Sequence, residues 1–191
     1  MIALDLNRLP DEVRKSIPNN ENIYWIGKPK WASLGYQVFG LKYLVFYFLF
    51  SALYAVSQIE LVFSFTAFAR HYIPFLISGV SAGFILFVLA YLVAYHTSYV
   101  ITEKRLVIKT GVALVFLLNV PFKNVVSIDK QTFGKGCGNL SFTSQSKKRI
   151  PFLSCWPSVK SGSFKQPIPA FRSISNIEEI GTLVTELAEK N

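Results

Sequence analysis

The fold is decided by residues 73–95, which read IPFLISGVSAGFILFVLAYLVAY. These 23 residues carry no formal charge. As a helix they would reach about 34 Å, at about 1.5 Å per residue, which exceeds the roughly 30 Å hydrocarbon core of a bilayer. The stretch therefore predicts one membrane-spanning helix, and the remainder of the chain is interpreted outward from it.

A second apolar stretch of 27 residues precedes this one, from Tyr43 to Ala69. As a helix it would reach about 40 Å, so tilt or a polar end must accommodate the excess length. Residues 70–74 contain Arg70, His71 and Pro74 and are expected to form a tight turn. We therefore expect a transmembrane helical hairpin made of residues 43–69 and 73–95.

A third apolar stretch, residues 106–122, does not meet the requirements of a span. It contains Lys109 and Pro121, and its longest apolar run, Val112 to Leu118, has seven residues. A run of that length suits a buried strand and is too short for a spanning helix. The first 40 residues contain charges and prolines without an apolar centre, so no cleavable signal peptide is expected there.

The composition agrees with a membrane protein that has a modest water-facing portion. Of the 191 residues, 51% are hydrophobic and only 16% are charged, with a net charge of +9. Soluble domains carry about a quarter charged residues, so an ordinary soluble domain and a disordered chain are both disfavoured. Two cysteines and two histidines exclude a disulfide-dense scaffold and any standard zinc module.

The distribution of basic residues predicts the orientation. Six Lys and Arg lie in residues 1–42, one in the hairpin turn and thirteen in residues 96–191. Basic residues favour the cytoplasmic side, so both termini are expected there. Cys137 and Cys155 would then be free, and neither has the neighbours of a nucleophile, so both are interpreted as buried structural cysteines.

From Thr97 onward the hydrophobic pattern changes to period two. Short alternating segments separated by Gly- and Ser-rich turns predict six or seven strands, the last of which contains Ile150 and Phe152. A Pro-rich connector over 156–169 precedes one amphipathic helix, whose start is predicted by a capping box of Ser175 and Glu178. The core-facing stripe of that helix is expected to comprise Ile177, Ile180, Val184 and Leu187.

The predicted fold class is therefore an α+β membrane protein. Residues 1–42 form a cytoplasmic N-terminal segment, and residues 43–95 form the hairpin. Residues 96–191 form a small β-barrel or sandwich capped by a C-terminal amphipathic helix, which is the outline of a pleckstrin-homology-like (PH-like) domain.

Charge is segregated within this domain. Residues 96–172 hold twelve Lys and Arg against two acidic residues, a net charge of +10. Such a domain next to a membrane helix is attracted to anionic lipid. The run Lys147, Lys148 and Arg149 is a candidate lipid contact, and a solvated hairpin turn is the alternative.

Three residues in the hairpin are candidates for partner contact or helix packing. Gly79 and Gly83 form a GxxxG motif, which lets helices approach closely. The first helix of the hairpin is its default partner, and another protein or a second copy of this chain is the alternative. Glu60 is the one acid in a spanning stretch, where it is either functional or reaches the interface.

No pattern in the sequence predicts catalysis. Neither a Ser/His/Asp or Cys/His arrangement nor a metal-ligand or paired-carboxylate arrangement is present, so we expect no enzyme, no catalytic residue, no metal and no bound cofactor. The net charge alone does not indicate nucleic-acid binding, because no strand combines aromatic and basic residues for base stacking.

A series of motifs resembles the bacterial PH-like domain of PuhB-type photosynthetic-complex assembly proteins. Residues 99–108 read YVITEKRLVI, residues 111–114 read GVAL and residues 119–122 read NVPF. A Trp156-Pro157 dipeptide and the segment PAFR (169–172) follow, and YWIGKP (24–29) resembles the entry motif of membrane-anchored bacterial PH-like proteins.

This resemblance implies an assembly factor of the bacterial inner membrane, multi-pass and non-enzymatic, which helps to build the photosynthetic reaction centre and its core light-harvesting complex. Its partners would be subunits of those complexes and membrane lipid, with bacteriochlorophyll contact left as an open alternative. A general membrane-anchored PH-like module that binds anionic lipid or scaffolds other complexes is the alternative function. The candidate partner positions carried over are Asn119, Pro121, Phe122, Trp156, Pro157 and Arg172.

Overall fold

The structure is a computed structural model that describes residues 10–18, 21–59, 64–112, 114–145, 152–163 and 166–191. The chain divides into two compact units. The first, which we call the sheet unit, contains residues 1–33 and 92–191, and the second, the helical unit, contains residues 34–91. Residues 1–33 thus belong with the C-terminal domain, whereas the sequence was divided at residue 42.

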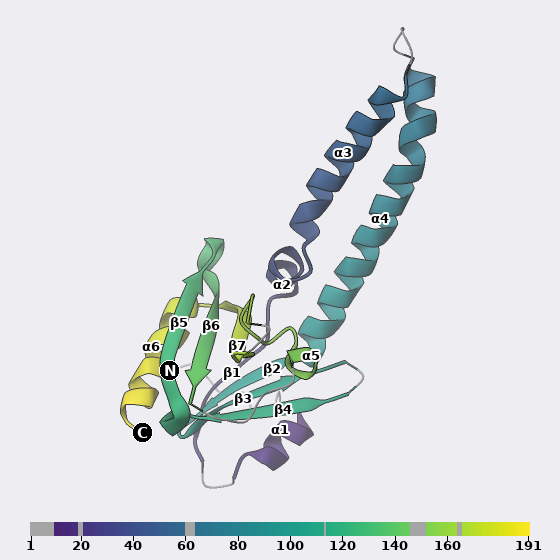
Figure 1. Ribbon diagram of the computed structural model, residues 1–191. Helices are drawn as coiled ribbons and strands as arrows, with labels where there is room; N and C mark the ends of the chain where they lie inside the picture. Colours follow the sequence, from purple (N-terminus) through teal and green to yellow (C-terminus); the bar gives the residue numbers. More distant parts are fainter. Residues whose placement is uncertain (1–9, 19–20, 60–63, 113, 146–151, 164–165) are drawn as a thin grey trace. The chain divides into compact units, whose positions relative to one another are not determined.

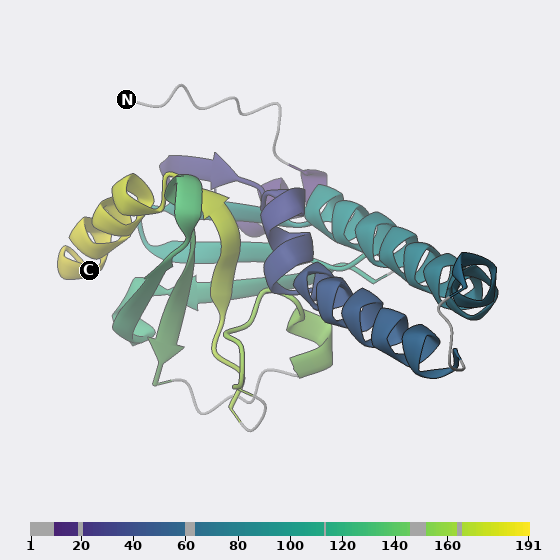
Figure 2. The same cartoon turned by 90° about the horizontal axis from the view of Figure 1, so that it is seen from above.

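The sheet unit contains two antiparallel sheets (Figure 1). The strand order of the first sheet is β1-β2-β3-β4, and that of the second is β5-β6-β7. The strands of the two sheets cross one another in Figure 1 and Figure 2. Their bounds are β1 Ile23–Gly27, β2 Ser98–Thr102, β3 Arg105–Thr110, β4 Phe116–Pro121, β5 Val125–Thr132, β6 Cys137–Ser144 and β7 Ala170–Ser175.

Short helices and one longer helix complete the sheet unit. The amphipathic helix α6, Ile177–Glu189, packs on β5 and β6, and its predicted stripe of four apolar residues is buried. The short elements are α1 Asp11–Ser16, η3 Phe122–Asn124, η4 Gly134–Gly136 and α5 Phe152–Cys155.

An aromatic cluster centred on Phe171 of β7 joins the two sheets. Its ring lies 4.6 Å from that of Tyr99, 4.9 Å from Phe142 and 6.0 Å from Trp25, between ring centroids. These side chains come from both sheets and are buried in one continuous core with α6. The described strands therefore form a sandwich-like pair of sheets with a shared core, and no sheet among them closes into the barrel that was the other predicted form.

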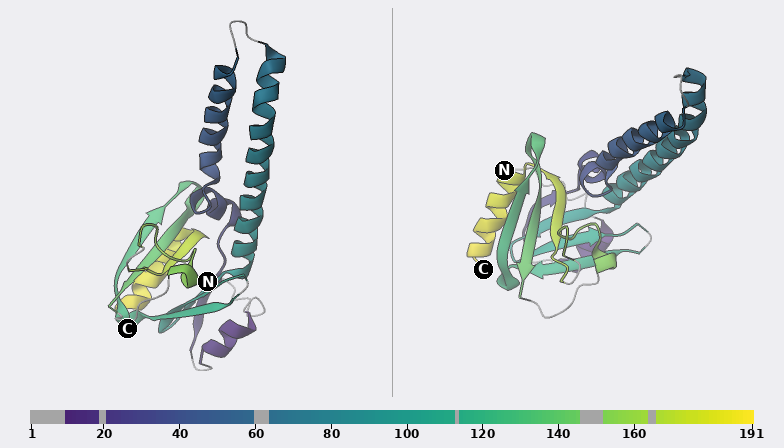
Figure 3. Two further views of the ribbon diagram at one scale, coloured as in Figure 1. Left: turned by 45° about the vertical axis from the view of Figure 1, so that its right-hand side comes forward. Right: turned by 45° about the horizontal axis from the view of Figure 1, so that its top comes forward.

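The helical unit is built from α3, Leu44–Ser57, and most of α4, Phe65–His96. The two helices lie side by side in both views of Figure 3. Helix α2, Trp31–Gln37, and the 3₁₀ turn η2, Leu41–Tyr43, precede them. By length and composition α4 can cross a membrane, and α2 with residues 41–57 meets the same test as a pair bent by 56°.

The prediction of one continuous helix over residues 43–69 is wrong. Helix α3 ends at Ser57, where the hydroxyl bonds back to the Tyr54 carbonyl at 2.7 Å and Gln58 follows as the C-terminal cap. Helix α4 begins at Phe65, after Ser64, whose carbonyl accepts from the Phe68 N–H at 3.0 Å. Glu60 lies outside the described residues.

The turn expected over residues 70–74 is also wrong, because α4 continues through it with Pro74 inside the helix. Proline removes one helical hydrogen bond, but long apolar helices tolerate this loss. Stacking of Phe68 on Tyr72, with ring centroids 5.2 Å apart, supports the helix just before the proline. The break between the helices therefore lies nearer to residue 60 than to residue 72.

Three details of the sheet unit differ from the prediction. Helix α6 begins after Asn176, whose φ is +54°, and the capping box is absent because Glu178 pairs with Lys130 of β5 instead. Phe152 starts the short helix α5 and does not lie in a strand. Residues 170–175, to which the sequence analysis assigned no strand, form strand β7.

Candidate functional site

The GxxxG face of α4 is covered by α3 of the same chain. A Cβ atom built on Gly79 would lie 2.5 Å from the Phe48 ring and 2.6 Å from the Tyr47 ring. At Gly83 the corresponding neighbour is the end of the flexible Leu44 side chain, at 2.9 Å. The two glycines therefore permit close packing within the helical unit, which was the default partner in the sequence analysis.

Polar and aromatic contacts add to this packing. The Tyr47 hydroxyl donates to the Phe75 carbonyl at 3.1 Å and lies 2.6 Å from the Ser78 hydroxyl. The Tyr54 and Phe75 rings meet edge to face, with centroids 5.5 Å apart. Because both polar groups of the pair are satisfied internally, this contact is suited to an environment without water.

The outer faces of α3 and α4 remain apolar and exposed. Most large side chains of α3 are exposed, and α4 has a similar set from Phe65 to Tyr91. An apolar surface of this extent needs lipid or other apolar helices to cover it. The exposed residues of α3 include Val45, Phe46, Leu49, Phe50, Leu53, Tyr54 and Val56.

The C-terminal end of α4 lies in the sheet unit, where it meets the end of β1. The Lys28 ammonium donates to the Tyr95 carbonyl at 3.2 Å and lies 4.9 Å from the centre of the Tyr95 ring. His96 Nδ1 contacts the Leu92 carbonyl at 2.8 Å. A cation here is favourable because the last carbonyls of a helix carry partial negative charge. Neither Lys28 nor Tyr95 could be identified from local sequence patterns, since their pairing depends on long-range strand register.

Arg172, one of the positions carried over from the family resemblance, is buried in the sheet unit. Its backbone N–H donates to the Tyr99 hydroxyl at 3.1 Å, and its Nη2 donates to the Ser161 hydroxyl at 3.0 Å. Its Nε has no hydrogen-bond partner among the described residues. Burial lowers the pKa of the Arg172 guanidinium from its ordinary value.

The segment after Trp156 is tied to the same place. The Ser158 hydroxyl lies 3.2 Å from the Tyr99 hydroxyl, and its carbonyl accepts from the Ala170 N–H at 2.9 Å. Pro157 is buried beside it, whereas Trp156 is partly exposed. The structure therefore brings Trp156, Pro157 and Arg172 into one region, largely as interior residues.

The other carried-over positions lie on β4 and the turn after it. Phe122 is buried in the core, Pro121 pairs in register with Arg105, and Asn119 is exposed. They lie near one another in the chain, but none of the contacts between described residues joins them to Arg172. The candidate lipid contacts Lys147, Lys148 and Arg149 lie outside the described residues.

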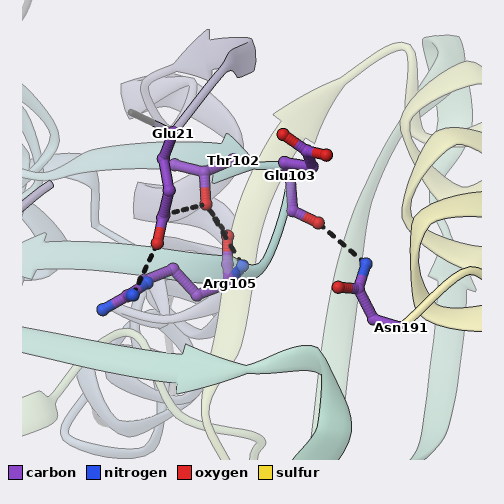
Figure 4. A network of polar contacts seen from close by, with 5 residues as sticks. All are labelled: Glu21, Thr102, Glu103, Arg105 and Asn191. Atoms are coloured by element: carbon purple, nitrogen blue, oxygen red, sulfur yellow. Dashed lines mark hydrogen bonds and ion pairs between the residues drawn. The ribbon is translucent and has the colours of Figure 1, made fainter. Parts of the chain in front are cut away.

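Figure 4 shows how the β2–β3 turn is held. The Glu21 carboxylate accepts from Arg105 Nη2 at 2.5 Å and from the Thr102 hydroxyl at 3.1 Å, and the Glu21 side chain is only 3% exposed. Asn191 donates to the Glu103 carbonyl at 2.9 Å. Glu21 and Asn191 thereby fasten the turn, and the charge of Arg105 is engaged structurally.

Other lysines of the sheet unit also form ion pairs, so less of the net charge of +10 is available to a ligand. These ion pairs are Lys109–Glu12, Lys130–Glu178 and Lys160–Asp129.

The two cysteines are buried and free, as expected, and burial raises the pKa of the Cys155 thiol. Within the described ranges no group of three or more His, Cys, Asp and Glu side chains could hold a metal ion.

Two sheets that share a core, capped by one C-terminal amphipathic helix and joined to a long apolar helix, define a PH-like domain on a candidate membrane helix. The chain belongs to the bacterial PH domain family, whose model matches residues 36–188. The family assignment agrees with the predicted PH-like fold.

Two similar proteins accompany this assignment. An uncharacterised 23.7 kDa protein of Rhodobacter capsulatus, encoded in the puhA 5′ region, is 26% identical over 179 residues, covering 91% of this chain and 82% of its own. A crystal structure of a DUF1696 family protein with a pleckstrin-homology domain from Shewanella loihica is 15% identical, covers 48% of this chain and 71% of its own, and has a TM-score of 0.32.

Proposed function

We propose that this protein is a membrane-anchored, non-enzymatic assembly factor for the photosynthetic reaction centre and its core light-harvesting complex. The observation that carries the proposal is the relative from the puhA 5′ region, which matches nearly the whole chain of a bacterial PH domain protein. The PuhB-type motif series of the sequence points in the same direction.

The helical unit supports the membrane part of the proposal. Helix α4 is long and apolar enough to cross a bilayer, and its GxxxG face already holds α3. The apolar outer faces of the two helices are then available to lipid and to the membrane helices of a nascent subunit. We propose the bacterial inner membrane as the location, with both termini on the cytoplasmic side because the basic residues concentrate there.

The sheet unit would engage the cytoplasmic part of the same client. Its core depends on contacts between distant strands, so it offers a rigid surface that does not need a ligand to form. Assembly without chemistry also fits the described residues, whose polar clusters are engaged in holding the fold.

Deletion of the gene tests this proposal. In cells grown phototrophically, the deletion should lower the absorbance of the reaction centre and the core antenna, and the intact gene supplied in trans should restore it. A variant with Gly83→Ala, a change that the flexible Leu44 side chain can accommodate, serves as a matched positive control. Unchanged absorbance in the deletion strain would contradict the proposal.

A second candidate function is a general PH-like module that binds anionic lipid or scaffolds other membrane complexes. Lys28 and Lys30 favour it, because both are exposed and follow β1 at the place where α4 ends. The reconstituted full chain should then recruit anionic lipid around itself in a salt-dependent manner, whereas a client-specific factor would show no such preference.

A further inference from the structure

The loop between β3 and β4, together with the first residue of β4, exposes a cluster of large apolar side chains, which we call the hairpin tip: Val112, Leu114, Val115 and Phe116. Leu114 is 70% exposed, and the other three are exposed by 36–48%. No charged residue lies between Lys109 and Lys123 in the sequence. Exposed apolar side chains gathered in one loop mark an interaction surface, because a soluble loop of this kind would ordinarily be polar.

Strand register places this tip beside the end of α4. Helix α4 ends at His96, and β2 begins two residues later, with Ser98 opposite Lys109 of β3. The hydroxyls of Thr97 and Thr110 are 3.5 Å apart. The chain therefore leaves the sheet after Thr110, at the point where the helix enters it, and this follows from contacts within the sheet unit alone.

Strand β1 ends at this same end of the sheet. Gly27 pairs with Tyr99, so Lys28, Lys30 and Trp31 follow at the helix end. Trp31 and Tyr95 are both exposed there. Tryptophan and tyrosine concentrate at the membrane interface, and lysines near the cytoplasmic leaflet are attracted to anionic lipid. This end of the sheet thus combines apolar, aromatic and basic residues, the three classes that a bilayer interface accommodates.

We propose that the hairpin tip inserts into the lipid interface on the side of the membrane where α4 ends. Amphipathic elements bury their apolar face about 5–10 Å into the boundary between headgroups and acyl chains, and Leu114 would enter that layer. The tip gives the sheet unit a second attachment to the bilayer, in addition to the covalent connection at His96. This inference rests on the proposed membrane anchoring and extends it.

The conformation of the tip is fixed by one residue. Gly111 has a φ of +108°, and a Cβ atom there would overlap the Leu114 carbonyl oxygen. Only glycine fits this position, since its backbone lies in the region that side chains disfavour and the space is filled. Leu114 is therefore presented outward by the backbone and does not fold back over the sheet.

The test places an environment-sensitive nitrobenzoxadiazole fluorophore on Leu114→Cys in the full chain, reconstituted into phosphatidylcholine vesicles that contain nitroxide-labelled lipid. The matched control is Val126→Cys. Val126 is an apolar residue that is 59% exposed at the start of β5, and it follows the opposite end of β4. The unsubstituted protein measures any labelling of Cys137 and Cys155, which are buried.

The proposal predicts blue-shifted emission and several-fold stronger quenching by the nitroxide lipid at position 114 than at position 126. Equal, weak quenching at both positions, in protein that resists alkaline extraction, would overturn the tip insertion and leave the membrane anchor intact. Shielding at position 114 that requires a co-purified protein subunit would overturn it as well, since the tip would then bind protein. Release of the whole chain by alkali would instead overturn the anchor, and the inference with it.

Discussion

The Tyr99 hydroxyl accepts a hydrogen bond of 3.1 Å from the backbone N–H of Arg172, a residue 73 positions further along the chain. Tyr99 belongs to β2 of the four-stranded sheet and Arg172 to β7 of the three-stranded sheet. The same hydroxyl lies 3.2 Å from that of Ser158. One buried phenol therefore joins both sheets and the connector before β7, and burial raises the pKa of Tyr99, so the phenol stays protonated.

Replacing Tyr99 by phenylalanine should destabilise the protein without changing its fold. The ring stacking on Phe171 is kept, but the Arg172 N–H and the Ser158 hydroxyl lose their buried partner. An unsatisfied buried polar group costs about 1–3 kcal/mol. The expected result is a lower thermal midpoint of the sheet unit in detergent, measured by circular dichroism at the β-sheet signal. An unchanged midpoint would show that the cross-sheet bond contributes nothing.

Replacing Phe171 by alanine should be more damaging, because three buried rings surround it. Removal of a core phenylalanine costs about 3–5 kcal/mol through lost burial and the cavity left behind. The variant is expected to lose cooperative unfolding of the sheet unit, while Val126→Ala, at an exposed apolar position, should behave like the unsubstituted protein. Equal midpoints for the two variants would contradict the placement of Phe171 at the centre of the core.

The two glycines of α4 should respond differently to substitution. Gly79→Leu drives a side chain into the Phe48 and Tyr47 rings, whereas Gly83→Ala meets only the flexible end of Leu44. We expect Gly79→Leu to separate α3 from α4. The measurement is cross-linking by a flexible bismaleimide between cysteines introduced at Tyr54 and Phe75, whose rings meet between the two helices with centroids 5.5 Å apart, in each background. Similar cross-linking yields for Gly79→Leu and Gly83→Ala would show that the glycine face does not hold α3.

The attachment of α6 should weaken in acid. The hydrogen bond from Lys130 holds the pKa of the Glu178 carboxyl below its ordinary value of 4.5, and Thr132 adds a weaker hydrogen bond. Because the folded pKa is depressed, the ion pair contributes fully above pH 4.5 and is lost as pH falls through the lower folded value. The protection factors for amide hydrogen exchange in the first turns of α6, which correct for the slower intrinsic exchange in acid, should therefore fall below that pH.

Two variants control this acid response. Lys130→Met should remove the pH dependence at the start of α6, because the pKa of Glu178 would return towards its ordinary value. Lys160→Met breaks the separate ion pair with Asp129 and should leave the exchange profile of α6 unchanged. If both variants kept the full acid response, the response would arise from another group.

Much of this fold could be predicted from local sequence patterns. The apolar stripe of α6 and the period-two alternation that begins at Thr97 are local signals, and the structure confirms the first as a helix and the start of the second as the β2–β3 hairpin. The uncharged stretch over 73–95 also lies within α4, the helix able to cross a membrane. These elements are specified by residues close together in the chain, so their periodicity is enough.

The remaining elements depend on distant contacts. Strand β1 pairs with β2 more than 70 positions away, and β7 follows a proline and is buried along most of its length, so neither shows a distinct alternation. The polar residues Gln58 and Glu60 lie next to the break between α3 and α4, but they were interpreted as the polar end of one long helix. The proximity of Lys28, Tyr95 and the hairpin tip can be inferred only once the register of β1, β2 and β3 is known.

The central claim is that this protein holds subunits of the photosynthetic apparatus during assembly. The most direct measurement is to purify the tagged full chain in mild detergent from phototrophically grown cells, and to record both its co-purifying polypeptides and its absorbance spectrum. The account predicts reaction-centre or core-antenna subunits in the eluate, in amounts that fall with Gly79→Leu. A colourless preparation that carries only lipid, equal to a control purification of an unrelated tagged membrane protein, would contradict it.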